Sequence, residues 1–175
     1  MIAFMLKQPL LTSALLLVAL AVSIVIAAFG FEHIGGFQPC PLCLIERKSW
    51  YFAVPAGLLT LVALKIDRQG FAKLLLLVIG IMFIANVGLA GYHAGVEWKW
   101  WAGPSSCSGN HLTPLGGPGG LLEAISKTKV VRCDIAQFRL FGLSFAGYNV
   151  LLSLLAAFIA AYGIFFQARR LSAED

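Results

Sequence analysis

The chain has 175 residues, of which 59% are hydrophobic and 12% are charged, and its mean hydropathy is +0.86. A soluble domain carries about 25% charged residues, so this chain has too little polar surface to cover a water-soluble globule. The composition therefore excludes an ordinary cytosolic enzyme, a disordered regulator and a nucleic-acid binder, and the net charge of +5 is too small to change that conclusion. It predicts an integral membrane protein.

Four apolar stretches predict membrane-spanning helices. They lie at about residues 10–30, 46–65, 72–91 and 143–166. A span needs roughly 20 apolar residues, but the uncharged part of the second stretch, Ser49 to Leu64, has only 16. It becomes long enough if Arg47 and Lys65 extend from its ends to the interface. The first stretch is longer than the apolar part of a signal peptide, so we predict a single all-α domain over residues 1–175, built as a four-transmembrane-helix bundle.

The predicted spans also carry residues suited to helix–helix contact. Ala53 and Gly57 in the second span would let two backbones approach closely, as would Ala157 and Ala161 in the fourth. Asn86 in the third span is more typical of a hydrogen bond between helices than of a transport path. A transporter would require an ionisable group inside the membrane, and the confident spans contain none.

Four spans place both termini on one side of the membrane and the first and third connections on the other. The third connection is long. Its Pro/Gly-rich piece at 114–120 is followed at 121–127 by apolar and polar residues at helical spacing, which predict a short amphipathic helix on the bilayer surface. Positive residues are divided almost evenly between the two sides, so charge gives only a weak preference for cytoplasmic termini.

All four cysteines fall in the two connections that share a side, two in each. They are Cys40, Cys43, Cys107 and Cys133. The first two form a C-x-x-C motif, the spacing of thiol–disulfide exchange sites. Pro41 suits the first position of a helix, so Cys43 would lie in the first turn, where the helix dipole favours its thiolate. Arg47 lies one turn further along the same face; it could stabilise that anion or anchor a lipid phosphate.

Other interpretations of the cysteines are weaker. Leu44 rather than His follows the motif, which excludes haem attachment. A structural zinc site would want a second closely spaced pair, but Cys107 and Cys133 are 26 residues apart. A disulfide between these two could simply close their loop, or it could be exposed and exchangeable. The glycines at 116–120 favour exchange, so we favour a redox site over a zinc site.

These residues together resemble the disulfide bond formation protein B (DsbB) family. The resemblance is carried by Gln-Pro-Cys-Pro-Leu-Cys-Leu-Ile-Glu-Arg at 38–47, Gly-Tyr-His at 91–93 and Cys-Asp at 133–134, and it extends over the whole chain. It implies a protein-disulfide:quinone oxidoreductase that reoxidises a periplasmic DsbA-like thioredoxin-fold oxidase. Electrons would pass to a membrane quinone, either ubiquinone or menaquinone, and the activity would support disulfide bond formation in exported proteins.

The resemblance also assigns roles to the cysteines by position. Cys107 and Cys133 would form the redox-active disulfide that faces the partner, with Cys107 receiving the thiolate of the partner. Cys40 and Cys43 would form the second redox-active disulfide, with Cys43 nearest the quinone. A disulfide between Cys40 and Cys133 would be a transient intermediate. No metal is implied.

Three further residues belong to the implied site or lie near it. Arg47 would support the quinone or the Cys43 thiolate, and His93 would be a second quinone contact. Glu46 either belongs to the site or pairs with a nearby base. Because lasting disulfide chemistry belongs to an oxidising compartment, the resemblance implies a bacterial inner membrane protein with periplasmic cysteine loops and cytoplasmic termini.

Two rival functions stay open at this point. A vitamin K epoxide reductase-like enzyme combines similar parts, but its C-x-x-C follows the loop pair, whereas here it precedes the pair. The second rival is a non-enzymatic membrane scaffold held by structural disulfides or zinc.

Overall fold

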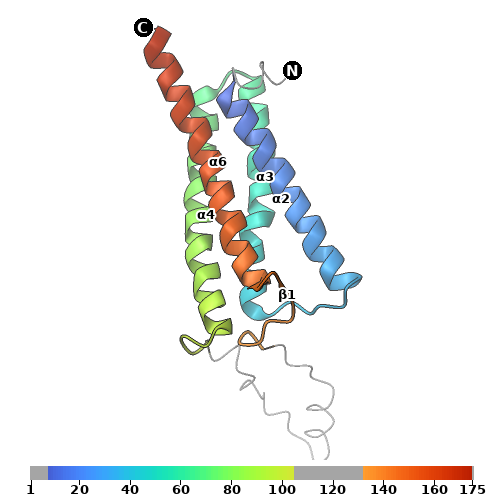
Figure 1. Cartoon of the computed structure of the whole chain (residues 1–175). Coiled ribbons are helices and arrows are strands. Elements are labelled where there is room, and N and C mark those ends of the chain that lie inside the picture. Colours follow the sequence, from blue (N-terminus) through green and yellow to red (C-terminus); the bar gives the residue numbers. More distant parts are fainter. Residues whose placement is uncertain (1–7, 105–131, 175) are drawn as a thin grey trace, which may run out of the picture.

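The computed structural model describes residues 8–104 and 132–174, and over these residues the chain is mostly helical. The described residues form four long helices, namely α2 Pro9–His33, α3 Pro41–Lys65, α4 Gln69–Glu97 and α6 Phe145–Glu174. The helices α2 and α4 each pack against both α3 and α6. The start of α2 and the end of α6 lie at one end of the bundle, while the connection from α2 to α3 lies at the other (Figure 1).

Within the described residues, three helices are long and apolar enough to cross a membrane: α2, α4 and the part of α6 from Phe145 to Gln167. The helix α3 is not among them, because its first two turns contain Glu46, Arg47 and Lys48. Large apolar side chains point outward from the bundle, as in Ile26 at 65% and Phe158 at 67% exposure. The chain is therefore a membrane protein; the amphipathic helix predicted at 121–127 lies outside the described residues.

The helices continue past the ends that hydropathy predicts. The helix α3 begins at Pro41 rather than near residue 46, with the proline at its first position as predicted. The helix α4 continues to Glu97 rather than ending near residue 91. Both extensions carry ionisable residues, and both lie at the end of the bundle where α2 connects to α3. The polar residues of the chain are thus brought onto helix ends that face one another.

The interior is packed through small residues and two large aromatic rings. A Cβ added to Gly57 of α3 would lie 2.5 Å from Cγ2 of Val18 in α2, so the two backbones approach closely there, as predicted. The rings of Trp50 and Phe83 lie 4.6 Å apart between α3 and α4. The amide Nδ2 of Asn86 donates a hydrogen bond of 3.0 Å to Oγ of Ser153, which confirms that Asn86 joins α4 to α6. Such close contacts, rather than hydrophobic burial alone, hold helices together in lipid.

A short hairpin precedes α6. Strand β1, Arg139–Leu140, pairs antiparallel with β2, Leu143–Ser144. The two residues of the turn, Phe141 and Gly142, have φ values of 51° and 83°, as expected for a tight two-residue hairpin turn. The last residue of β2 accepts a hydrogen bond of 3.3 Å from the backbone N–H of Gly147, which caps the start of α6.

Four phenylalanines fix the connections to this end of the bundle. Their rings lie 5.0 to 6.1 Å apart and come from the end of α2, the α2–α3 connection, the segment before β1 and the start of α6. They are Phe31, Phe37, Phe138 and Phe145. Edge-to-face and offset aromatic pairs contribute about 0.5–1.5 kcal/mol each beyond their burial. The cluster therefore holds the two segments that carry cysteines against the helices.

The contact at Gly57 can be tested by adding a methyl group. We expect Gly57→Ala to lower the free energy of unfolding by about 1–3 kcal/mol, because the new methyl overlaps a stiff, β-branched valine. Gly88→Ala in α4 is the matched control, since nothing lies within 4 Å of the added Cβ; its higher helix propensity should make it neutral or slightly stabilising. Chemical unfolding in detergent measures both, and Val18→Ala should restore the loss. Equal effects of the two glycine substitutions would contradict the contact.

Candidate active site

The C-x-x-C motif forms the start of α3. Cys40 is the N-cap, and its Sγ accepts a hydrogen bond of 3.2 Å from the backbone N–H of Cys43. The hydrogen bonds that Cys43 donates lower the pKa of the Cys40 thiol, against the opposing effect of burial. Sequence reasoning placed the stabilised anion on Cys43, in the first turn. The structure instead directs the free N–H of that turn at the cap residue, so the helix N-terminus favours the thiolate of Cys40.

Cys133 lies in the same buried cluster as Cys40. The two sulfur residues are 1% and 3% exposed and form one buried cluster with Leu42. Cys133 is disulfide-bonded, whereas Cys40 and Cys43 are free thiols; Cys107 lies outside the described residues. The side chain of Gln137 donates a hydrogen bond of 2.5 Å to the carbonyl of Gln38, which links the two cysteine-bearing segments. The predicted gathering of both segments on one side thus brings Cys40 and Cys133 into one buried cluster beside one cavity.

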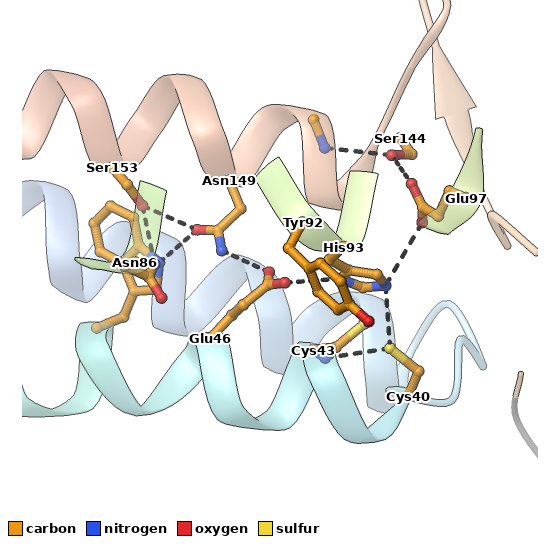
Figure 2. Close-up of polar contacts among 12 residues, drawn as sticks. Cys40, Cys43, Glu46, Asn86, Tyr92, His93, Glu97, Ser144, Asn149 and Ser153 are labelled. Atoms are coloured by element: carbon orange, nitrogen blue, oxygen red, sulfur yellow. Dashed lines mark hydrogen bonds and ion pairs between the residues drawn. The ribbon is translucent and has the colours of Figure 1, made fainter. Parts of the chain in front are cut away.

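His93 reaches the cysteines from α4, one turn before that helix ends. Its Nε2 lies 3.5 Å from Sγ of Cys40, and its Nδ1 lies 2.7 Å from Oε1 of Glu46. The same Nε2 lies 3.9 Å from Oε1 of Glu97, whose other oxygen accepts a hydrogen bond from the hydroxyl of Ser144. These contacts form a continuous row in Figure 2. His93 is therefore wedged between a thiol and a carboxylate.

Glu46 is buried, and each of its oxygens has a partner. Oε1 meets the ring of His93, and Oε2 accepts a hydrogen bond of 2.7 Å from Nδ2 of Asn149 in α6. The amide oxygen of Asn149 in turn accepts a hydrogen bond of 2.9 Å from the indole N–H of Trp50 and a longer one of 3.4 Å from Ser153. The base that pairs with Glu46, left open from the sequence, is His93. Figure 2 shows this polar ladder running from the cysteines into the bundle.

Sequence reasoning did not select Asn149, Glu97 or Ser144. Asn149 carried a usable signal, because it is a polar residue inside an apolar run, as Asn86 is. The other two lie close to the ends of predicted spans, where polar residues are ordinary, so nothing in the sequence singles them out.

Arg47 faces α2. Its NH1 donates a hydrogen bond of 2.6 Å to Oε2 of Glu32 near the end of α2, and its guanidinium lies 5.7 Å from the centre of the Phe29 ring. The side chain is 13% exposed. Arg47 is thus directed into the bundle, where its charge is paired with a carboxylate.

Two cavities meet at the motif. The larger, about 330 Å³, lies among α2, α3 and α6. Its walls are mostly apolar, and the polar side chains on them include Cys43, Glu46, Arg47 and Asn149. The smaller, about 120 Å³, is lined by Cys40, Cys43, His93, Arg47 and Cys133 among others. Cys43 and Arg47 line both cavities, whereas His93 lines only the smaller one.

The same cluster contains ligands suited to a soft cation. One donor atom from each of Cys40, Cys43 and His93 lies within 4.8 Å of the others. The arrangement can therefore exchange disulfides at Cys40, expose a thiol to an apolar cavity at Cys43, or coordinate a metal through all three residues.

Comparison with known proteins gives a consistent result. Residues 11–163 match the family model described as disulfide bond formation protein DsbB. A curated relative from Marinobacter nauticus, named disulfide bond formation protein B, is 28% identical over 158 residues, which cover 85% of this chain and 86% of the relative. An uncharacterized protein from Rickettsia prowazekii is 24% identical over 141 residues, covering 80% of this chain and 79% of its own length.

The role of Asn149 can be tested through stability. We expect Asn149→Leu to lower the free energy of unfolding by about 1–3 kcal/mol for each partner left unsatisfied, namely Oε2 of Glu46 and the indole of Trp50. Tyr148→Phe is the neighbouring control, because it removes only a surface hydrogen bond of 3.0 Å to the carbonyl of Leu140; its cost should be about 1 kcal/mol or less. Denaturant unfolding in detergent compares them. A loss no greater than that of the control would rule out a structural role for the ladder.

Proposed function

The chain belongs to the DsbB family of membrane proteins that act in disulfide bond formation, and we propose that it reoxidises a periplasmic DsbA-like dithiol oxidase and passes the electrons to a membrane quinone. The observation that carries the proposal is the position of the C-x-x-C motif. Cys40 shares a buried cluster with the disulfide-bonded Cys133, and Cys43 lines an apolar cavity among the helices. The motif therefore joins a thiol-exchange side to an acceptor side.

On the thiol-exchange side, the partner dithiol would reduce a Cys107–Cys133 disulfide, its thiolate attacking Cys107. The released Cys133 would then attack Cys40 of a Cys40–Cys43 disulfide. In this exchange a Cys133–Cys40 bond forms, the Cys40–Cys43 bond breaks, and Cys43 leaves as a thiolate. The second thiol of the partner would then displace Cys107 and close the partner disulfide. Attack of the released Cys107 on Cys133 would re-form the Cys107–Cys133 bond and free Cys40, so that the motif holds both electrons as a dithiol. The shared buried cluster of Cys133 and Cys40 supports this order, because it places the two residues near each other without movement of a helix.

On the acceptor side, the larger cavity fits the ring of a quinone. Small-molecule sites are mostly apolar with a few placed polar groups, and this cavity has apolar walls with the Cys43 thiol and the Arg47 guanidinium among them. Ubiquinone and menaquinone both satisfy this description. A bound quinone accepts two electrons and two protons. Cys43 would face it, and Arg47 would orient its oxygen and favour negative charge beside it.

Protons released by the thiols need an acceptor, and the Glu46–His93 pair supplies one. Nε2 of His93 faces Cys40, and Glu46 holds the ring through Nδ1. A proton taken from Cys40 at Nε2 can be balanced by movement of the Nδ1 proton to Glu46, which lines the larger cavity. The contacts of His93 therefore support a role at the thiol, while its predicted contact with the quinone stays a prediction.

We further propose that α3 is a fourth span and that the cysteine end of the bundle is periplasmic. The helix α3 returns from the end where α2 finishes to the end where α4 begins (Figure 1). If α2 and α4 cross the membrane, α3 must cross it too, with its charged first turns at the interface. Lasting disulfides require the oxidising side, so both termini would be cytoplasmic and the membrane would be the bacterial inner membrane.

The proposed reaction can be tested with purified protein. We expect it to oxidise a reduced thioredoxin-fold partner catalytically when a short-chain ubiquinone or menaquinone is added, with one quinone reduced for each disulfide formed. Cys43→Ser and Cys40→Ser should each abolish quinone reduction, followed by its absorbance. Leu44→Ser introduces the same hydroxyl at the adjacent, exposed position. It should leave quinone reduction unchanged. Turnover by a chain that lacks both cysteines would refute the proposal. Absence of turnover by the unaltered chain would also refute it and would favour the non-enzymatic membrane scaffold.

The role of Arg47 has a separate test. Arg47→Lys keeps the positive charge but loses the planar fork, so we expect the apparent KM for quinone to rise about tenfold, equal to roughly 1.4 kcal/mol. Thiol exchange with the partner, measured by trapping the mixed disulfide, should be unaffected. Lys48→Met is the control for a neighbouring positive charge. An unchanged KM would leave Arg47 only a structural role, in its ion pair with Glu32.

A further inference from the structure

We propose that the reduced C-x-x-C pair and His93 form a binding site for Zn²⁺, and that the bound cation holds the pair in its reduced, inactive form. Zinc binding itself depends only on the three donor atoms. The inhibition of turnover by zinc rests on the proposed function. It differs from a four-cysteine structural zinc site, since it uses one histidine and exists only while both thiols are free.

The donor atoms have spacings close to those of a tetrahedral zinc site. Zn–S bonds of about 2.3 Å and Zn–N bonds of about 2.0–2.1 Å place neighbouring sulfur and nitrogen ligands about 3.6 Å apart, and two sulfurs about 3.8 Å apart. Sγ of Cys40 and Nε2 of His93 are 3.5 Å apart, and the donors of Cys40, Cys43 and His93 all lie within 4.8 Å of one another. Small side-chain rotations would bring all three onto one ion.

The surroundings of His93 match those of a metal ligand. Zinc-binding histidines usually donate their second ring N–H to a carboxylate, which fixes the tautomer. Here Glu46 lies 2.7 Å from Nδ1 and is itself held by Asn149, so Nε2 is the nitrogen directed at the sulfurs. No rearrangement of the ring is needed for it to bind a cation.

Charge and space also favour a divalent ion. The guanidinium groups of Arg47 and Arg132, which both line the smaller cavity, are paired with Glu32 and Asp134. Glu97 lies 3.9 Å from Nε2 of His93. Two thiolates would therefore bind a cation with carboxylates nearby. The smaller cavity, about 120 Å³, adjoins all three ligands and leaves room for water in the fourth position, as in zinc sites that are not closed by protein.

Binding and oxidation exclude each other. Two thiols and one Zn²⁺ give a zinc dithiolate and release two protons, with no change in oxidation state. A Cys40–Cys43 disulfide has no thiolate left to bind the ion. Zinc would thus bind the state that forms after electrons arrive from the partner and would keep it from passing them on.

The test measures metal binding apart from turnover. The chain is reduced with a phosphine, freed of reductant and titrated with Zn²⁺ against a chromophoric chelator, in parallel with an oxidised sample. A Cys107→Ser/Cys133→Ser background, with only the motif cysteines left, is titrated too. We expect one zinc per reduced chain and none per oxidised chain in both. Co²⁺ should give the charge-transfer band of cobalt–thiolate bonds and the visible bands of tetrahedral geometry.

Substitutions identify the ligands. Cys40→Ser, Cys43→Ser and His93→Ala should each remove the tetrahedral cobalt spectrum, and Glu46→Gln should weaken zinc binding by about 10–100-fold while keeping the ligands. His33→Ala is the control, because His33 lies at the same end of the bundle on α2 and contacts only its own helix and the Phe29 ring in the described contacts. Loss of zinc binding in the His33 variant, or full binding without His93, would overturn the proposal.

The outcomes separate this inference from the proposed function. Catalytic turnover in zinc-free buffer together with no zinc uptake by the reduced chain would overturn the zinc site alone. Zinc retained by the oxidised chain would also overturn it. Redox-dependent zinc uptake by a chain that never reduces quinone would support the site while refuting the proposed function. Turnover that stops with one equivalent of zinc and resumes with chelator would support both.

Discussion

The buried contact between Glu46 and His93 is the constraint around which the functional end of the bundle is arranged. A carboxylate is stable inside an apolar bundle only if its oxygens have partners. One oxygen meets His93 of α4 and the other meets Asn149 of α6, so a single side chain from α3 fixes the register of three helices. Because Glu46 occupies one ring nitrogen, the other nitrogen of His93 faces Cys40. The orientation of the base toward the sulfur therefore follows from the pairing of the acid.

The same pairing explains how charges and an apolar cavity coexist at one site. Arg47 is paired with Glu32, and Glu46 is paired with His93, so neither charge requires water for stabilisation. The remaining wall of the larger cavity can then be apolar. Cys43 lines both cavities. The smaller cavity is also lined by Cys133, whereas the larger one lies among the helices. One turn of α3 thus divides two chemical environments.

Local signals in the sequence predicted the parts of the fold that depend on neighbouring residues. Hydropathy located α2, α4 and α6, and Pro41 marked the start of α3, because each signal lies within its own helix. The same method ended α4 too early, since hydropathy falls at His93 and Glu97 although the helix continues. These residues are accommodated by partners on other helices. The contact between Glu46 and Asn149 joins residues 103 positions apart, and no local pattern encodes such a contact. The DsbB motif indicated that 38–47 was important without indicating what Glu46 would bind.

The N-cap of α3 links this chemistry to the fold. Cys40, the proposed reactive sulfur, also satisfies the N–H of Cys43, so a reaction at Cys40 would alter a hydrogen bond of the first turn. Pro41 has no backbone N–H. The first turn therefore contains fewer unsatisfied donors when the hydrogen bond from Cys43 to Cys40 weakens. The turn is also held from outside, because Phe37 in the preceding connection packs against Phe138 and Phe145. The first turn of α3 can therefore change its bonding at Cys40 while Glu46, one and a half turns later, keeps its partners and the bundle keeps its register.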